Sequence, residues 1–576
     1  MPGPALRTPR HKPCPRTRKM TVIAQDPSVE GLNGGVLTVS LDVPLERLAP
    51  GPRGSRVHVI DYDVSNNVLY RPTSKGLDKD HYVNMTDRDR LISDRNFHSL
   101  NVYAIVMTTL ARFENALGRR APFSFPGGGL YPGAAPGRGH VIKVAPHAFV
   151  EANAFYSRRD EGLFFGYFTS GKKTIFTCLS YDVIAHETTH SLLDGLRSRY
   201  MDRSSPDQAA FHEGFADVIA ILSVFQNSKV IDASFPKGRK GKIAPGLLSS
   251  EKLRRSFLVG VADEMGQELK KVRGNPLRNS ALLKPSPRYL EEDEFKEEHR
   301  RGEIFVAAML NAFLEVWRHR LWDIGLEERI SIDRDRVVKE GAEAASHLLT
   351  MAIRAIDYAP PVDLQFGDFL TALLTADHEL YPDDSRYKYR AALEKAFVSF
   401  GIKSIVKSGM WNPPKTSLRC NHFDSLKREP DEAFAFLWEN QKRLELHPDA
   451  YTYVPSVRPC SRVDTDGFIL HETIVEYVQI LDLKAGELSR LRKVRKPNKM
   501  PNTEHVRLYG GGVLVFDEFG SLKYHVNSKV DSEKQTKRLK YLWNRGDFNQ
   551  PQALRRFATL HRMRMLGGAA DTKEKW

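Results

Sequence analysis

Apolar residues recur every three to four positions in several long stretches of the chain, and this spacing predicts amphipathic helices. The clearest stretch, 97–117, is followed by Gly118, a residue type that commonly ends helices. The same spacing predicts helices at 303–318, 337–358, 366–381, 386–400, 531–545 and 552–565. Shorter stretches of β-branched and aromatic residues predict strands at 34–44, 141–144, 153–156 and 163–168, and hairpins within 57–70 and 510–526. The chain is therefore predicted to be an α+β protein.

The order of these elements divides the chain into four parts. Residues 1–35 are predicted to form a flexible basic tail, and 36–175 a β-rich lobe. Residues 176–402 are predicted to form a helical lobe, and 403–576 an accessory α/β module that binds a partner or covers a cleft. The start of the chain is basic and lacks an apolar run of the kind found in secretory signals. We therefore expect a cytoplasmic protein, with export by a non-classical route as the alternative.

One predicted helix carries the pattern His-Glu-x-x-His, at His186, Glu187 and His190. Residues four apart lie on the same face of a helix, so both imidazoles can reach one metal ion. Neutral imidazole nitrogen suits Zn²⁺, and two such nitrogens fill half of a tetrahedral site. Glu187 would lie beside that ion, where it can act as a general base. The pattern predicts a catalytic zinc site.

A second predicted helix offers the carboxylates that such a site needs. A catalytic zinc requires a third protein ligand and keeps one position open for water. Glu213 is the candidate third ligand, and Asp217 lies one turn later on the same face. Asp217 can accept the other N–H of a zinc-bound imidazole and so fix its tautomer.

The chain resembles the gluzincin metallopeptidases, and among these the thermolysin-like family, in two motifs taken together. These motifs are His186-Glu187-x-x-His190 and Glu213-x-x-x-Asp217. The resemblance extends over about 90–402. It implies a two-lobe fold, with a β-rich lobe, a helical lobe and one catalytic Zn²⁺ in the cleft. It also implies a zinc-dependent endopeptidase whose substrates are peptides or proteins.

The resemblance implies roles for further residues. In the family, an edge strand lines the cleft and pairs with the substrate backbone, and the matching positions are Asn153 and Ala154. Arg278 matches an arginine that holds a substrate carbonyl. His299 and Tyr200 match residues that stabilise the oxyanion. The family's calcium site is not expected, because Val224 replaces one of its acidic residues, although Asp182 matches another.

Composition narrows the possible partners. The chain of 576 residues has a net charge of +15, which permits binding to nucleic acid, anionic lipid or acidic protein. It carries no recognised nucleic-acid-binding motif, so we do not expect nucleic acid as a partner. The chain has no run of about 18 apolar residues, so no membrane span is predicted. The four cysteines are scattered and predict no disulfide framework.

Two other function classes remain open at this stage. A gluzincin aminopeptidase would share the zinc ligands, but the chain has no Gly-x-Met-Glu-Asn-type element for gripping a free amine. A zinc-stabilised binding or scaffold protein would keep the fold without turnover. Glu187 argues against the scaffold, because it holds no metal and a scaffold has no need of it.

Overall fold

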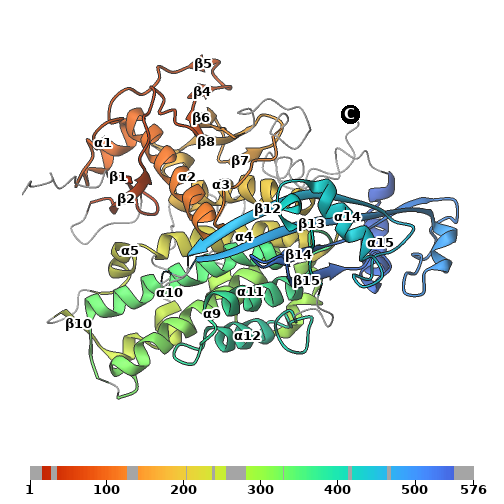
Figure 1. Cartoon of the computed structure of the whole chain (residues 1–576). Coiled ribbons are helices and arrows are strands. Elements are labelled where there is room, and N and C mark those ends of the chain that lie inside the picture. Colours follow the sequence, from red (N-terminus) through yellow and green to blue (C-terminus); the bar gives the residue numbers. More distant parts are fainter. Residues whose placement is uncertain are drawn as a thin grey trace, which may run out of the picture.

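The structure, a computed structural model, describes residues 16–27, 35–125, 140–202, 204–236, 241–254, 280–328, 330–412, 418–463, 467 and 469–549. Figure 1 shows three regions in chain order: a strand-rich region with one long helix, a layered set of helices, and a long antiparallel sheet with its own short helices. Helices and strands are thus mixed along the chain.

The strand-rich region is built on a five-stranded sheet. Its main path runs β3-β6-β8-β7, with β9 also paired to β8. β3, β6 and β8 are parallel, whereas β7 and β9 run antiparallel to β8, so β7 forms an edge of the sheet. The strands are β3 (Val57–Val59), β6 (Ile142–Phe149), β7 (Ala154–Ser157), β8 (Gly162–Ser170) and β9 (Lys173–Phe176).

Two smaller pairs and a long helix complete this region. β1 (Thr17–Ile23) pairs with β2 (Thr38–Pro44), and β4 (Tyr62–Asp63) pairs with β5 (Val68–Leu69). The helices are α1 (Arg88–Ser93) and α2 (Arg95–Leu117). α2 begins at the Asp94 cap and ends at Gly118, whose φ of 68° suits glycine. The helix predicted at 97–117 is thus confirmed.

Two predictions for this region need correction. The flexible tail predicted over 1–35 contains β1, because Val22 and Ile23 are fully buried against α2 and β2. The hairpin predicted within 57–70 forms only at β4 and β5. Val57–Val59 instead pairs in parallel with β6, because both of its valines face the core.

The helical region surrounds α4 (Pro206–Phe225), which packs against α3 (Tyr181–Leu196), α9 (Glu298–Leu321) and α10 (Arg334–Ala355). α4 is long and apolar enough to cross a membrane, but 94% of its apolar window is buried inside the protein, as in a core helix. The remaining helices and strands here are α5 (Ser228–Ala233), α11 (Phe366–Leu380), α12 (Tyr389–Ser399), β10 (Lys242–Ile243) and β11 (Ile332–Asp333).

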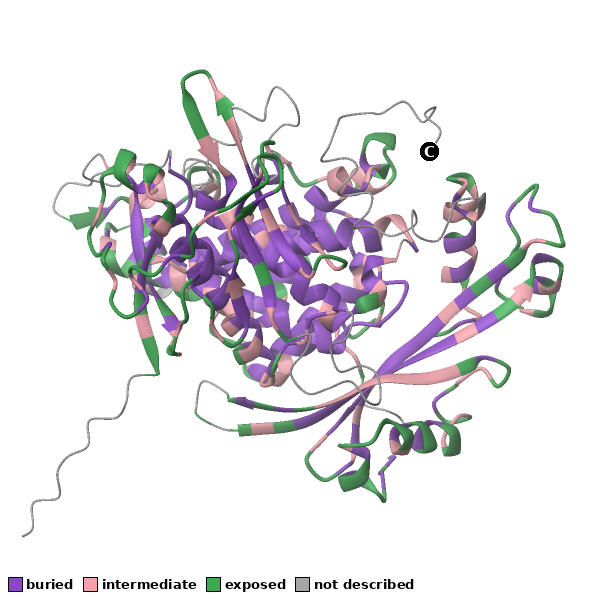
Figure 2. Cartoon of the chain, turned by 90° about the horizontal axis from the view of Figure 1, so that it is seen from above, coloured by how far each residue is buried: buried purple, intermediate pink, exposed green. Residues whose placement is uncertain are grey.

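Residues beyond 418 form a four-stranded antiparallel meander in the order β12-β13-β14-β15. Seen from above, its long strands leave the buried helices and become exposed toward their far ends (Figure 2). The hairpin predicted within 510–526 is confirmed by β14 and β15. The elements are β12 (Tyr451–Val463), β13 (Ile469–Lys484), β14 (His505–Phe516), β15 (Leu522–Ser528), α13 (Phe423–Leu426), α14 (Pro430–Glu439) and α15 (Glu533–Asn544).

This C-terminal sheet shares a core with the helices. Cys460, Ile474, Val513 and Tyr524 belong to the same buried cluster as the residues of α4 and α9. A buried ionic network crosses the same boundary, because Asp357 accepts hydrogen bonds from Arg119 on one side and Arg462 of β12 on the other. The segment predicted to be an accessory module is therefore an integral layer of the protein.

Candidate metal centre

α3 places the two histidines of the His-Glu-x-x-His motif side by side. The ring centroids of His186 and His190 lie 4.4 Å apart, with the rings nearly perpendicular. The predicted helix is confirmed, and the turn before it supplies the cap residue Ser180. His190 is buried, whereas His186 is partly exposed, so the pair lies at the boundary between core and solvent.

α4 brings a carboxylate to both imidazoles. Glu213 Oε2 lies 3.6 Å from His186 Nε2, and Glu213 Oε1 lies 3.5 Å from His190 Nε2. Ligand atoms bound tetrahedrally to zinc at roughly 2.0–2.1 Å are separated by about 3.3 Å. The three side chains therefore have the chemistry and nearly the spacing of a zinc ligand set.

Asp217 holds the His186 ring from the side opposite its Nε2 atom. Its Oδ1 lies 2.8 Å from His186 Nδ1, so the carboxylate accepts the Nδ1–H of that ring. This hydrogen bond leaves the Nε2 lone pair of His186 directed toward Glu213 and His190. Asp217 thus selects the tautomer that a metal ion requires.

Replacing Asp217 by Asn should weaken zinc binding by about 10–100-fold, since the amide supports the His186 tautomer less strongly than the carboxylate does. Competition against a fluorescent zinc chelator measures this change. Asp424→Asn is a matched control, because the Asp424 side chain is 97% exposed. Equal zinc affinity in all three proteins would show that Asp217 does not support the site.

His299 approaches the same centre from α9. Its Nε2 lies 3.6 Å from Glu213 Oε2, and its Nδ1 lies 2.9 Å from Glu297 Oε1. The approach depends on a close crossing of α4 and α9 at two glycines. A Cβ added at Gly214 would lie 3.0 Å from the carbonyl oxygen of Gly302, and one added at Gly302 would lie 3.0 Å from that of Ala210.

Gly302→Ala should separate α4 and α9 by a few tenths of an ångström and move His299 relative to Glu213. We expect a loss of about 1–3 kcal/mol in unfolding free energy, typical of overpacking. Turnover of any substrate should also fall, by about 10-fold or more, because misplacement near 1 Å can cost about 10²-fold. Gly246→Ala is the matched control, since no atom lies within 4 Å of a Cβ there. Identical stability and turnover in both variants would contradict this account.

Glu187 lies beside the ligand set but is held by a different element. Its Oε2 accepts the backbone N–H of Tyr156, in the edge strand β7, at 2.9 Å. Burial raises the pKa of Glu187 to about 8, with further contributions from the nearby Glu213 and Asp217 carboxylates, against the lowering effect of His186. A carboxyl group with a pKa near neutrality can both accept and return a proton. Sequence reasoning missed the Tyr156 contact, because a backbone donor leaves no signature in the sequence.

The predicted substrate strand lies next to this glutamate. β7 is the edge strand that contains Ala154, and Asn153 immediately precedes it. Both residues are buried, and the Asn153 side-chain amide has no hydrogen-bond partner among the described residues. The outer edge of β7 faces Glu187 through the Tyr156 N–H. An extended peptide added to this edge would run past the metal ligands.

Tyr200 does not face the site, and its predicted oxyanion role is wrong. It is 1% exposed, its hydroxyl donates to the carbonyl oxygen of Pro360 at 2.7 Å, and its ring packs against Phe211. Asp182 accepts a hydrogen bond from Ser180 Oγ at 2.5 Å, a local contact at the start of α3. Arg278, the other predicted substrate-binding residue, lies outside the described residues.

His212 is a neighbour of the site to which sequence reasoning gave no role. Its ring stacks on that of His190 with centroids 4.6 Å apart, and it is buried. His190, His212 and Glu213 also converge closely enough to share an ion. The position of His212 directly before Glu213 in the sequence is the signal that could have indicated its closeness to the site. In this arrangement the His212 ring packs against the face of the His190 ring.

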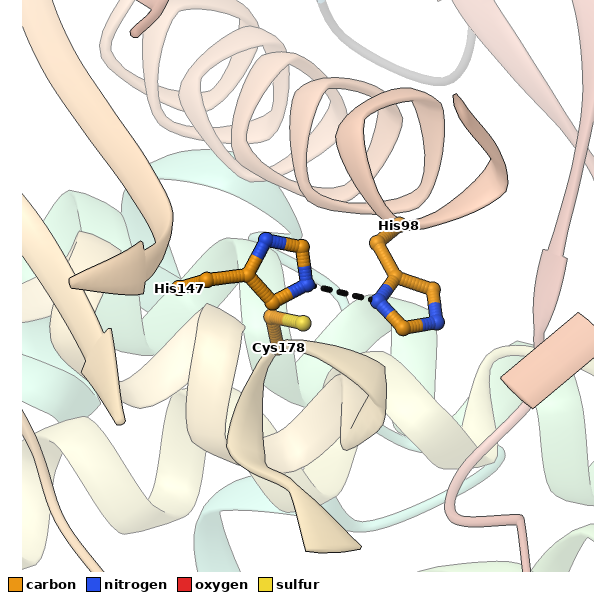
Figure 3. A group of neighbouring side chains, drawn as sticks. All are labelled: His98, His147 and Cys178. Carbon is orange, nitrogen blue, oxygen red and sulfur yellow. Dashed lines mark hydrogen bonds between the residues drawn. The ribbon is translucent and has the colours of Figure 1, made fainter. Parts of the chain in front are cut away.

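A separate buried cluster contains His98, His147 and Cys178 (Figure 3). His98 Nδ1 lies 2.8 Å from His147 Nε2, and His147 Nδ1 lies 2.9 Å from an Asp61 oxygen. A separation of 2.8 Å is typical of a hydrogen bond and shorter than the spacing of about 3.3 Å between tetrahedral zinc ligands. Burial lowers the pKa of His98 to about 3, so that ring is neutral. We interpret the cluster as a hydrogen-bonded chain within the core.

The zinc-site interpretation rests on these residues and their geometry, because the wider comparisons add nothing to it. No protein-family model matches the chain, and no curated protein sequence matches it.

Proposed function

We propose that the protein is a zinc-dependent endopeptidase. The observation that carries the proposal is that the two Glu213 oxygens lie 3.6 Å from His186 Nε2 and 3.5 Å from His190 Nε2. Glu187 lies close to both histidines. His186, His190 and Glu213 would hold one Zn²⁺, and the donor set suits that ion. Bound there, Zn²⁺ supplies a Lewis acid that polarises a peptide carbonyl and lowers the pKa of a coordinated water toward about 7.

Glu187 is the proposed general base. It takes a proton from the water that attacks the carbonyl carbon of the peptide bond, and it then passes that proton to the leaving nitrogen. The Tyr156 N–H fixes one of its oxygens beside the metal ligands, and proton transfer by a positioned carboxylate is typical of general acid–base catalysis. A single buried carboxyl group thus acts as base and then as acid.

His299 is the proposed donor to the developing oxyanion. With Glu297 accepting a hydrogen bond from Nδ1, a protonated His299 ring would present an Nε2–H toward Glu213. A donor aimed at charge that develops in the transition state is typically worth about 10²–10³-fold in turnover. Backbone pairing of the substrate with Ala154 of β7 would position the peptide without regard to most of its side chains. Asn153 would contribute through its side-chain amide, because its backbone N–H and carbonyl oxygen are hydrogen-bonded to Glu151 and Gly166.

The proposal is tested with a mixture of peptides whose amino and carboxyl ends are chemically blocked. We expect internal cleavage, seen by mass spectrometry, which is lost with a zinc chelator and restored by added zinc. Blocked ends also distinguish an endopeptidase from an aminopeptidase, because an aminopeptidase requires a free amino terminus on its substrate. Zinc binding without any cleavage would instead favour a metal-stabilised binding protein.

A further inference from the structure

Asp194 lies on α3 one turn after His190, and no step of the proposed reaction uses it. Its side chain is inaccessible to solvent. Oδ2 accepts the hydroxyl hydrogen of Tyr156 at 2.8 Å and the Nε–H of Arg158 at 2.7 Å, and a second Arg158 nitrogen donates to Oδ1. Tyr156 belongs to the edge strand β7, and Arg158 directly follows that strand. One buried carboxylate thus binds both the strand and the residue after it.

Tyr156 is bound to α3 at both of its ends. Its backbone N–H donates to Glu187 Oε2 at 2.9 Å, while its hydroxyl donates to Asp194. Glu187 and Asp194 are seven residues apart on α3, so they lie on nearly the same face, about 10.5 Å apart along the helix axis. Tyr156 is buried, with 6% exposure. It therefore runs along two turns of α3 inside the protein and connects the two carboxylates.

The position of β7 depends on these contacts with α3. The strand spans only Ala154–Ser157, and its inner edge pairs with β8. Its other edge faces α3, where the Tyr156 N–H meets Glu187. Hydrogen bonds to a charged acceptor are about twice as strong as those between neutral groups, and Asp194 accepts several of them. Asp194 therefore holds β7 against α3.

We propose that Asp194 is a positioning residue for the general base Glu187. This inference rests on the proposed endopeptidase function. By binding the Tyr156 hydroxyl and Arg158, Asp194 keeps the Tyr156 N–H within hydrogen-bond distance of Glu187. Without that donor the Glu187 side chain can rotate into other staggered rotamers, away from the attacking water. A misplacement near 1 Å can cost about 10²-fold in turnover.

Tyr156→Phe is the sharpest test, because it removes the hydroxyl but keeps the ring in the core and leaves the pair of Arg158 with Asp194. We expect kcat on a blocked peptide to fall by about 10-fold with the zinc content unchanged. Tyr451→Phe is the matched control, because Tyr451 is 68% exposed, and it should keep wild-type kinetics. A Tyr156→Phe protein that is less stable but turns over at the wild-type rate would give Asp194 a structural role only and overturn the inference.

The dependence on Glu187 is tested in a second background. Residues that act as a unit give effects that do not add. In the Glu187→Gln protein, Tyr156→Phe should therefore lower the residual turnover by less than about 2-fold. A loss as large as that in the wild-type background would show that Tyr156 acts independently of the base, which contradicts the proposed role of Asp194.

A third readout does not depend on turnover. Hydrogen exchange in full-length Asp194→Asn and Tyr156→Phe should be at least about 10-fold faster at the amides of 154–157, with exchange in α12 unchanged, because the loosening is local. Wild-type exchange at 154–157 in both variants would overturn the inference even if the wild type cleaves peptides. Failure of the wild type to cleave any peptide would instead contradict the endopeptidase proposal, and the exchange at 154–157 would still decide whether Asp194 holds the strand.

Discussion

Glu187→Gln should lower kcat by about 10²–10⁴-fold while leaving zinc in place, because the proposed mechanism makes Glu187 the general base and not a metal ligand. The glutamine retains the size of the side chain and an oxygen that can accept the Tyr156 N–H, so β7 keeps its position. Substrate affinity should change much less than turnover. Steady-state kinetics on one cleaved peptide, with metal analysis of the same samples, measures all three quantities.

Glu291→Gln is the matched control for this substitution, because Glu291 is exposed and lies outside the ligand set. It should retain wild-type kinetics. A Glu187→Gln protein that binds zinc and turns over at the wild-type rate would remove Glu187 from the mechanism. A variant that loses zinc would instead place Glu187 among the groups that hold the metal.

Asp357→Asn should lower the unfolding free energy by about 3–5 kcal/mol, the usual cost of breaking a buried ionic network at one partner. The Asp357 side chain is inaccessible to solvent and accepts two hydrogen bonds from Arg119, at 2.6 and 2.7 Å, and another from Arg462. The substitution leaves both guanidinium groups buried with less compensation. Chemical denaturation monitored by circular dichroism measures the loss.

The same network predicts a pH dependence. Burial alone would raise the pKa of Asp357, but Arg119 and Arg462 outweigh it and hold that pKa well below its usual range. Its contribution is therefore complete above the unfolded value of about 3.9 and is lost as the pH falls below it. The stability difference between wild type and Asp357→Asn should shrink in acid. Asp482→Asn, at an exposed pair with Arg507, should change stability by at most about 1 kcal/mol at any pH.

Local patterns in the sequence predicted the helices of the site well. α3 and α4 carry apolar faces at helical spacing, so the positions of His186, His190, Glu213 and Asp217 on their helices follow from counting residues. The distances between the two helices do not follow from the sequence. They depend on how α4 packs against α3 and on the Gly214–Gly302 crossing with α9.

Other features escaped prediction for identifiable reasons. The prediction for Tyr200 follows its order in the chain, but Tyr200 lies in the short helix Ser198–Met201 and its hydroxyl donates to the buried carbonyl oxygen of Pro360. The long strands β12 and β13 carry mixed burial and many charges, which hides the two-residue alternation of a strand. The contact of Asp194 with Tyr156 joins a helix to a strand, so it depends on tertiary packing.

The central claim is that a single zinc, held by His186, His190 and Glu213, supports peptide-bond hydrolysis. The most direct measurement is a zinc titration of the metal-stripped full-length protein, with cleavage of a blocked peptide followed at each addition. We predict activity that rises in proportion to zinc and reaches its plateau at one equivalent per chain, with no activity in Glu213→Ala. Cleavage that persists without metal, or zinc that binds at one equivalent with no cleavage, would contradict the claim.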